Sequence, residues 1–423
     1  MRLRRLPPDE ALAQRRDPVD AETLRRAGAI VDDVRARGEV ALREHARRLG
    51  DLEEGAPLIL DRAALERTLH QRTREEWELL EIVAQRINAF AMAQKSALSP
   101  VSVAIPGGVA THDIAPIERA GCYAPGGRFP LPSSVLMTAV TARAAGAREV
   151  WVASPRPSAV TIAAAAVAGA DALLTVGGAQ AIAALAYGAG SVPACDVVVG
   201  PGNRWVTAAK QLVAGRVGID MLAGPSELLI IADGAADPRM IAADLLAQAE
   251  HDEDALPILV SVDAPLLDAV DAELERQLAD LPTAPTASAA LKNGFAVFTP
   301  KVEQAISIAN RIAPEHLELH LMHPESIAPE LLHYGALFIG SGSGEVLGDY
   351  GAGPNHVLPT GGTARFTAGL SVYTFLRART QIRIDDPAAA RQLAEDAARL
   401  ARLEGLEAHA RAADLRSTTG KKR

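Results

Sequence analysis

The N-terminal quarter of the chain carries apolar residues at spacings of three and four. The pattern runs from Ala21 to Lys95 and is clearest in AETLRRAGAIVDDVRARG and REEWELLEIVAQRINAFAMAQK. Residues at these spacings share one face of an α-helix, so the pattern is typical of amphipathic helices. The sequence therefore predicts a helical region ahead of the first strands.

Beyond Val101, short β-branched runs alternate with Ala- and Leu-rich stretches of helical length. The first series reads REVWVAS, SAVTIAAAAVAGA, DALLTV, AQAIAALAYGAG, DVVVG and NRWVTAAKQLVAG. The second reads ELLIIAD, DPRMIAADLLAQAEHD, LPILVSVD, APLLDAVDAELERQLADL and GALFIG. Strands separated by such helices predict right-handed βαβ crossovers and mostly parallel sheets. In these folds ligands sit beyond the carboxyl ends of strands, often between domains.

The expected fold class is α/β, with two Rossmann-like domains, a helical N-terminal segment and a C-terminal helical tail. A chain of 423 residues is long enough for two or three domains of about 150 residues each. The tail is predicted from PAAARQLAEDAARLARLEGLEAHARAADLR, which Glu404-Gly405 interrupts. The predicted limits are an N-terminal segment (1–20), a first α/β domain (21–120 and 227–370), a second α/β domain (121–226) and the tail (371–423).

The composition and charge argue against several classes of partner and location. A net charge of −9 and a pI near 5.6 argue against nucleic acid or an anionic membrane as the main partner, because phosphate binding needs concentrated Lys and Arg. The longest apolar stretches are broken by Gly or Asp, and MRLRRLPPDE has no apolar core after its basic start. We therefore expect a cytoplasmic protein without a membrane span or a secretion signal.

Only two cysteines occur, Cys122 and Cys195, and they lie far apart outside any CxxC motif. Neither a disulfide framework nor a thiolate zinc site is indicated. Any metal in this protein must therefore use nitrogen and oxygen ligands.

The stretch APEHLELH places Glu315 and His316 side by side directly after Pro314. One interpretation is a helix start, since proline fits the first helical position and an acidic residue favours the positive end of the helix dipole. The other is a pair of proton-transfer groups. The stretch alone does not decide between the two.

Two further segments could have a binding function, and the first of them could supply two ligands to one metal. In LLAQAEHDEDA, Gln248 and His251 are three apart on a predicted helix and leave the same face, although a solvated helix end would look the same. The loop GDYGAGPNHVLPTGG brings together Asp349, Asn355 and His356, and long structured loops at strand ends usually bind something.

Two glycine turns precede helices, VGGAQ ending at Gln180 and VGPGN ending at Asn203. Each could offer backbone N–H groups to a phosphate. Neither is the GxGxxG fingerprint of dinucleotide-binding folds, which the chain lacks. Read alone, His409 in EGLEAHARAA is a surface histidine.

Taken together, six segments in order resemble the histidinol dehydrogenase family. They are GCYAPGGRFPLPSSVLMTA, GIDMLAGPSELLIIAD, LLAQAEHDEDA, APEHLEL, GDYGAGPNHVLPTGGTARF and EGLEAHA. The resemblance runs from the N-terminal helices to the tail. It implies oxidation of L-histidinol through L-histidinal to L-histidine with two NAD⁺ and a bound Zn²⁺, the last two steps of histidine biosynthesis.

The resemblance also implies roles for individual residues. His316 would be the base for alcohol oxidation, and Glu315 would activate the water that attacks the aldehyde, which suits groups placed on different faces of one substrate. The zinc ligands would be Gln248, His251, Asp349 and His409, a set without cysteine that zinc accepts. Substrate contacts would come from Ser226, Gln248, His251, His316, Asp349, Glu404 and His409.

Tyr123, Gln180 and Asn203 match the positions that touch NAD⁺ in this family. Arg204-Trp205 departs from the small residue and tyrosine expected after Asn203, so the adenosine contacts are expected to differ. His356 would support the metal loop. The resemblance further implies a homodimer in which the C-terminal tail completes the partner's site.

Three other functions compete with this interpretation. A sister zinc and NAD dehydrogenase could act on another small alcohol, but Glu404 and His409 together suit an amine and an imidazole. A zinc hydrolase with Glu315 as base would need no NAD⁺, and the chain has no HExxH helix. A non-catalytic metal-binding protein would have no use for the Glu315-His316 pair.

Overall fold

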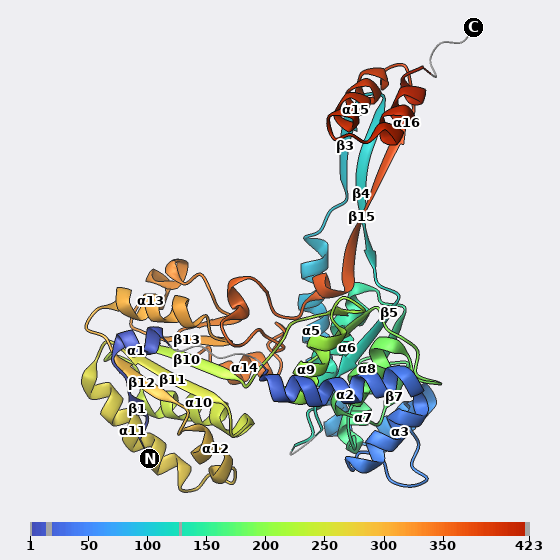
Figure 1. The fold of residues 1–423 in the computed structure, drawn as a ribbon. Helices are drawn as coiled ribbons and strands as arrows, with labels where there is room; N and C mark the ends of the chain where they lie inside the picture. Colours follow the sequence, from blue (N-terminus) through green and yellow to red (C-terminus); the bar gives the residue numbers. More distant parts are fainter. Residues whose placement is uncertain (1, 14–18, 127–128, 419–423) are drawn as a thin grey trace. The chain divides into compact units, whose positions relative to one another are not determined.

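The computed structural model describes residues 2–13, 19–126 and 129–418. The chain forms two compact units, which are described separately. Unit 1 comprises Met1–Ala93 and Ile117–Phe375, and unit 2 comprises Gln94–Pro116 and Leu376–Arg423. Figure 1 shows their helices and strands.

Unit 1 contains two six-stranded sheets, of which the first is entirely parallel. Its order is β1-β12-β11-β10-β13-β14. The strands are β1 (Arg4–Arg5), β10 (Glu227–Ala232), β11 (Leu256–Ser261), β12 (Phe295–Phe298), β13 (His316–His320) and β14 (Ala336–Ile339).

Helices cover both faces of this first sheet. Leu228 and Ile230 point to one face, against α10 (Pro238–His251), α11 (Ala264–Leu278) and α12 (Ala284–Ala290). Leu229 and Ile231 point to the other, against α1 (Pro8–Leu12) and α13 (Val302–Ile312). Because successive strand residues alternate between faces, the unbroken apolar run ELLIIA is what a doubly covered strand requires.

The second sheet has the order β2-β7-β6-β5-β8-β9 and is parallel except for the edge strand β2. The strands are β2 (Ile59–Asp61), β5 (Arg119–Tyr123), β6 (Glu149–Ala153), β7 (Ala172–Leu174), β8 (Val197–Val199) and β9 (Gly218–Ile219). The helices are α2 (Ala21–Arg37), α3 (Glu39–Arg48), α4 (Arg62–His70), α5 (Arg74–Ser96), α6 (Pro132–Ala145), α7 (Ala159–Val167), α8 (Gly178–Tyr187) and α9 (Arg204–Val213).

The N-terminal helices α2 and α3 belong with this second sheet. Ala27 and Val31 of α2 and Leu42 of α3 share a buried core with α8, α9 and Val198 of β8. This differs from the sequence-based domain limits, which group 21–120 with 227–370. The segment 1–20 also contributes β1, which pairs with β12 of the first sheet. Helical periodicity identifies these helices, but it does not say which sheet buries their apolar faces.

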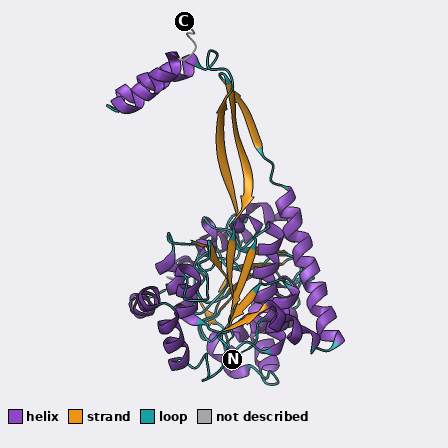
Figure 2. Cartoon of the chain, turned by 90° about the vertical axis from the view of Figure 1, so that its right-hand side faces the viewer, coloured by secondary structure: helices purple, strands orange, loops and turns teal. Residues whose placement is uncertain are grey.

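Unit 2 is built around an antiparallel sheet of order β15-β4-β3, visible as long strands in Figure 2. Its strands are β3 (Val101–Ile105), β4 (Gly108–Pro116) and β15 (Leu376–Ile384), and its helices are α15 (Arg391–Leu403) and α16 (Glu407–Thr418). The predicted helical stretch of the tail is confirmed, with Gly405 at φ +77° between the two helices, but the predicted limits (371–423) also take in the strand β15. The sheet itself was absent from the sequence-based expectations, because β4 and β15 pair across more than 250 residues of sequence.

The predicted fold class of mostly parallel α/β sheets is confirmed. Among the described residues, no helix is both long enough and apolar enough to cross a membrane.

Candidate active site

A cavity of about 1680 Å³ opens in unit 1, between the two parallel sheets. The second sheet contributes residues at the carboxyl ends of its strands, such as Tyr123 and Asn203. The first sheet contributes Ser226, Glu315 and His316, which lie at the amino ends of β10 and β13. The cavity therefore lies at the carboxyl ends of the strands of the second sheet, where a ligand was expected, and at the amino ends of the strands of the first.

Glu315 and His316 do not start a helix. Helix α13 ends at Ala313, which adopts a left-handed backbone (φ +52°), and β13 begins at His316. Both side chains of the pair are buried, at 6% and 2% exposure, and both line the cavity. The helix-start interpretation is thus wrong, because the chain leaves α13 through Ala313 and enters the sheet directly.

The backbone of Glu227 in the neighbouring strand β10 holds both members of the pair. Its N–H donates to Oε2 of Glu315 at 3.0 Å, and its carbonyl oxygen lies 3.3 Å from Nδ1 of His316. A carbonyl oxygen only accepts, so Nδ1 carries the hydrogen and Nε2 presents a lone pair. Among the described residues Nε2 of His316 is buried without a hydrogen-bond partner. This is the tautomer that a general base requires.

Burial shifts the titration of both groups toward their neutral forms. It lowers the pKa of His316 to about 4, against an opposing effect of the Asp349 carboxylate. It also raises the pKa of Glu315 well above its usual range, although hydrogen bonds from Glu227 and Ser226 act against that rise. The imidazole of His316 is therefore uncharged near neutral pH.

Three of the four predicted metal ligands gather beside this pair. Asp349, at the end of α14 (Glu345–Asp349), has Oδ2 3.6 Å from Nε2 of His251 and Oδ1 3.8 Å from Nε2 of His316. Gln248, one turn before His251 on α10, is fully buried. Gln248 and His251 thus lie one turn apart on α10, and His251 faces Asp349 in the cavity wall.

Glu345 is a member of this group that the sequence did not single out. Its side chain is 2% exposed, and Oε1 lies 4.0 Å from Nε2 of His251. In the orientation that satisfies the Gln248 amide, Nε2 donates to both carboxylate oxygens of Glu345, at 3.1 and 3.2 Å. That arrangement turns Oε1 of Gln248 away from Glu345, as a metal-ligating amide requires. Its place four residues before Asp349 on one helix was the available signal.

The donor set fits a zinc ion. His251, Glu345 and Asp349 each offer an atom within 4.8 Å of the others, and the amide oxygen of Gln248 adds a fourth donor. Imidazole nitrogen and carboxylate oxygen are ligands that zinc accepts. A bound cation would also compensate the burial of two carboxylates that have no Lys or Arg partner among the described ion pairs.

The glycine loop after Asp349 anchors this wall to α6. Nδ1 of His356 lies 3.0 Å from the carbonyl oxygen of Asp349, and its Nε2 lies 3.4 Å from Oγ of Ser134. Asn355 donates to the carbonyl oxygen of Met137 at 2.8 Å. These contacts agree with a supporting role of His356.

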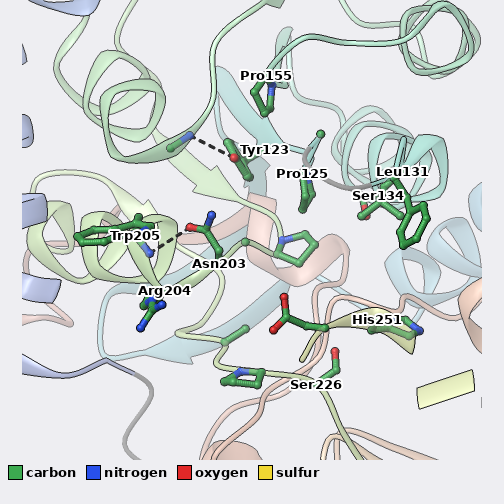
Figure 3. Close-up of a pocket in the computed structure, with 18 of the residues that line it drawn as sticks. Tyr123, Pro125, Leu131, Ser134, Pro155, Asn203, Arg204, Trp205, Ser226 and His251 are labelled. Atoms are coloured by element: carbon green, nitrogen blue, oxygen red, sulfur yellow. Dashed lines mark hydrogen bonds between the residues drawn. The ribbon is translucent and has the colours of Figure 1, made fainter. Parts of the chain in front are cut away.

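On the opposite side of the cavity, Tyr123 and Asn203 hold the two glycine turns (Figure 3). The Tyr123 hydroxyl accepts from N–H of Gly178 at 3.2 Å, and Oδ1 of Asn203 accepts from N–H of Trp205 and Val206. Asp51 accepts from N–H of Gly177 at 3.1 Å. The turns were expected to offer these N–H groups to a phosphate, but side chains of the chain itself already occupy them.

The comparisons with known proteins agree on one family. The family model described as histidinol dehydrogenase matches residues 13–417. The chain belongs to the histidinol dehydrogenase family.

Individual relatives agree with this membership. A histidinol dehydrogenase of Thermus thermophilus is 50% identical over 402 residues, covering 95% of both chains. One of Pseudomonas aeruginosa is 47% identical over 394 residues, covering 92% of this chain and 89% of its own. The crystal structure of histidinol dehydrogenase from Elizabethkingia anophelis superimposes with a TM-score of 0.90 at 30% identity and covers 98% of both chains.

Glu404 and His409, the remaining predicted residues of the family site, belong to unit 2. Glu404 ends α15, His409 lies in the first turns of α16, and both side chains are exposed. All residues that line the cavity come from unit 1. Ser226 lies in the cavity wall directly before Glu227, and Gln180 is buried at the start of α8.

Arg204 and Trp205, which depart from the family pattern, both line the cavity. The guanidinium of Arg26 lies over the Trp205 ring, 4.9 Å from its centroid. Trp205 packs against the core of α2, α8 and α9, while Arg204 is exposed. The aromatic character of position 205 is therefore used in packing.

Proposed function

We propose that this protein is a zinc-dependent histidinol dehydrogenase, which oxidises L-histidinol through L-histidinal to L-histidine with two NAD⁺ in the last two steps of histidine biosynthesis. The observation that carries this proposal is that the backbone of Glu227 forms hydrogen bonds with both Glu315 and His316. It leaves Nε2 of His316 as a free base beside Asp349 and His251.

In the first oxidation, Nε2 of His316 takes the hydroxyl proton of the alcohol. As the O–H bond breaks, the carbon releases a hydride to the nicotinamide of NAD⁺, and an aldehyde forms. Burial favours the neutral imidazole that this step needs, and the hydrogen bond from Nδ1–H to Glu227 keeps the ring in place. The proton then leaves His316 before the second oxidation.

In the second oxidation, a water molecule adds to the aldehyde. Nε2 of His316 then takes a hydroxyl proton of the hydrate as the carbon releases a hydride to a second NAD⁺, and the acid forms. Oε2 of Glu315 is engaged by Glu227, so we assign Oε1 to the proton of this water. The two groups can serve different atoms of one bound substrate because both side chains line the cavity, with Oε2 of Glu315 3.8 Å from Nδ1 of His316. This accounts for a Glu-His pair in place of a single histidine.

Gln248, His251, Asp349 and His409 would hold the zinc ion. Bound zinc would supply a positive centre that orients the imidazole and amine of the substrate. Glu345 would set the Gln248 amide, and Glu404 would pair with the substrate ammonium group. Tyr123, Gln180 and Asn203 would line the NAD⁺ site.

We assign the protein to a homodimer in which α15 and α16 complete the site of the partner. The surface of these helices supports this assignment, because Leu400, Leu403, Leu406 and Leu415 are exposed and the buried core of the helix pair consists of three alanines. Exposed leucines in such number are typical of an interface.

The test is NADH formation from L-histidinol and NAD⁺ by the purified protein, with and without a chelator. Two NADH per histidinol consumed, lost on chelation and restored by zinc, would support the proposal. Zinc-loaded, folded protein that forms no NADH from L-histidinol but oxidises another amino alcohol would indicate a sister dehydrogenase instead.

A further inference from the structure

A second group of possible metal ligands lies outside the cavity. Asp244 of α10, Glu318 in the middle of β13 and His320 at the end of that strand each offer one donor atom, and these atoms lie within 4.8 Å of one another. None of the three residues lines the cavity. We call this group the Asp244 cluster, and it is separate from the candidate zinc site.

Two neighbouring elements bring the Asp244 cluster together. Along β13, Glu318 and His320 are two residues apart, so their side chains leave the same face of the strand. On α10, Asp244 precedes Gln248 by four residues and lies one turn before it on the same helical face. One face of α10 therefore serves the candidate zinc site with one turn and the Asp244 cluster with the turn before.

The donor atoms of the cluster have the separation of ligands around one ion. Nε2 of His320 lies 3.2 Å from Oε2 of Glu318 and 3.6 Å from Oδ2 of Asp244. Ligands that bind one metal at about 2.0–2.2 Å are about 3–3.6 Å apart. The other oxygen of Glu318 accepts from N–H of Glu345, and such an outer hydrogen bond is what orients a metal-ligating carboxylate.

The two carboxylates of the cluster are buried with little opposing charge. The side chains of Glu318 and His320 are 1% exposed, and that of Asp244 is 17% exposed. Within the described residues, His320 is the only ion-pair partner of either carboxylate. Burial, followed by the charge of Glu318, raises the pKa of Asp244 to about 7, against the effect of His320. A bound cation would offset the cost of burying these two charges.

Two further observations point to a ligand. Nδ1 of His320 is buried without a hydrogen-bond partner in the described part of the chain, so this nitrogen can carry the hydrogen while Nε2 presents a lone pair to a metal. Gly344 has φ −74° and ψ 153°, which any residue can adopt, and a Cβ there would lie 3.5 Å from Oδ1 of Asp244 and 3.9 Å from Oε1 of Glu318. The glycine therefore leaves space beside both carboxylates for an ion and its water ligands.

One imidazole and two carboxylates suit a divalent transition-metal ion. Imidazole is a ligand of Zn²⁺, whereas Mg²⁺ and Ca²⁺ are bound through oxygen donors. An ion at the Asp244 cluster would join α10 to β13 and, through Glu318, to the start of α14. These three elements carry His251, His316 and Asp349 of the candidate active site.

We propose that Asp244, Glu318 and His320 bind a second divalent transition-metal ion, which stabilises the three elements of the candidate active site without contacting the substrate. The proposal goes beyond the proposed dehydrogenase function and does not depend on it. Its ion lies outside the cavity, so its role is to hold α10, β13 and α14 together.

The zinc content of the protein tests this proposal. Wild type, Asp244→Asn, His251→Ala and the double variant are dialysed against the same buffered free zinc, and the zinc per chain is measured by elemental mass spectrometry. The wild type should hold two zinc ions, each single variant one, and the double variant none. Asp32→Asn changes an exposed aspartate in the middle of α2, and this matched control should hold two.

The affinity of the second ion is measured by titrating free zinc in His251→Ala, which keeps the Asp244 cluster. Adding Asp244→Asn should lower that affinity at least about 100-fold, since loss of an outer hydrogen bond to a ligand already costs about 10- to 100-fold. Zinc should also raise the Tm of His251→Ala but not that of the double variant. Equal responses of these two proteins to zinc would overturn the proposal.

The zinc counts also separate this proposal from the proposed function. A wild type that holds a single zinc ion, lost in His251→Ala and kept in Asp244→Asn, would overturn the second site. A single zinc ion lost in Asp244→Asn and kept in His251→Ala would support the second site and contradict the zinc site of the proposed dehydrogenase.

Crystals of the wild type test the site even if Asp244→Asn does not fold. Anomalous diffraction at the zinc edge from zinc-saturated crystals should show an ion about 2.0–2.1 Å from Nε2 of His320. An ion at His251 and none at His320 would overturn the proposal.

Discussion

The backbone of Glu227 contacts both His316 and Glu315. Its carbonyl oxygen lies 3.3 Å from Nδ1 of the His316 imidazole, and its N–H donates to Glu315. One peptide segment of β10 thus sets the tautomer of the base and the orientation of its neighbouring carboxylate. Because the contacts are made by the backbone of a buried strand, the pair is held by the sheet itself.

The two bases are expected to separate the two oxidations. His316→Gln should reduce kcat with L-histidinol by 10²- to 10⁴-fold, the usual contribution of a general base. Glu315→Gln should oxidise L-histidinol to L-histidinal and then stall, giving one NADH per substrate. Counting the NADH formed per molecule of L-histidinol and, separately, per molecule of L-histidinal checks this. Equal losses of rate in both variants with both compounds would contradict the assignment.

Removing the Glu345 charge should shift metal affinity and stability of the metal-free protein in opposite directions. Burial raises the pKa of Glu345 well above its usual range, so its carboxylate is costly without a cation. Glu345→Gln should therefore leave the Tm of the metal-free protein unchanged or raised, while zinc affinity falls about 10- to 100-fold because Gln248 loses its orientation.

Competition with a chromophoric chelator and thermal unfolding with and without zinc measure these two effects. Glu325→Gln, a change at an exposed glutamate outside the cavity, is the control. A variant with unchanged zinc affinity would show that Glu345 does not serve the metal site.

Exchange of the tail between subunits should allow complementation. His316→Gln and His409→Asn are each expected to be inactive as homodimers. If the tail of one subunit completes the site of the other, a mixed dimer combines both lesions in one site and leaves the second site intact. Co-expression with two tags and purification of the mixed dimer should then recover about half of the wild-type activity per dimer. No recovery in a verified mixed dimer would place the tail in its own subunit's site.

The buried ion pair of Lys210 and Asp220 is expected to stabilise the loop after β8. Both side chains are at most 3% exposed, and Asp220 also accepts from N–H of Gly200 at 2.7 Å. Lys210→Met should lower the free energy of unfolding by about 3–5 kcal/mol, because it leaves the Asp220 carboxylate buried and unpaired. Adding Asp220→Asn should restore part of that loss. Urea unfolding measures both variants, and a loss below about 1 kcal/mol would contradict the argument.

Both cysteines are expected to be inert in the folded protein. Burial raises the pKa of Cys122 to about 12 and raises that of Cys195 as well. A raised thiol pKa leaves little reactive thiolate at pH 8, and burial excludes the reagent. A disulfide reagent at pH 8 should thus titrate no thiol in the native protein and two after denaturation. A thiol that reacts quickly before unfolding would place that cysteine in a more open environment.

Features formed by residues close together in the sequence could be predicted without a structure. The 3.6-residue periodicity predicted the N-terminal helices, and the alternation of short β-branched runs with stretches of helical length predicted the parallel strands, because both are local features of the sequence. The pairing of Gln248 with His251 also needed only helical spacing. The recognised segments placed Glu315, His316, Asp349 and Tyr123 as candidates, and the structure puts all four around one cavity.

Only the tertiary structure decided what lies across from these residues. Glu227 contacts Glu315, Glu345 contacts Gln248 and Asp51 contacts Gln180, and the two residues of each pair lie 88, 97 and 129 positions apart in the sequence. No local sequence pattern predicts contacts over such separations. The same holds for the amino ends of β10 and β13 facing the cavity, and for the strand pairing in unit 2. Periodicity records whether a side chain is buried, whereas the identity of the group that meets it depends on how distant segments pack.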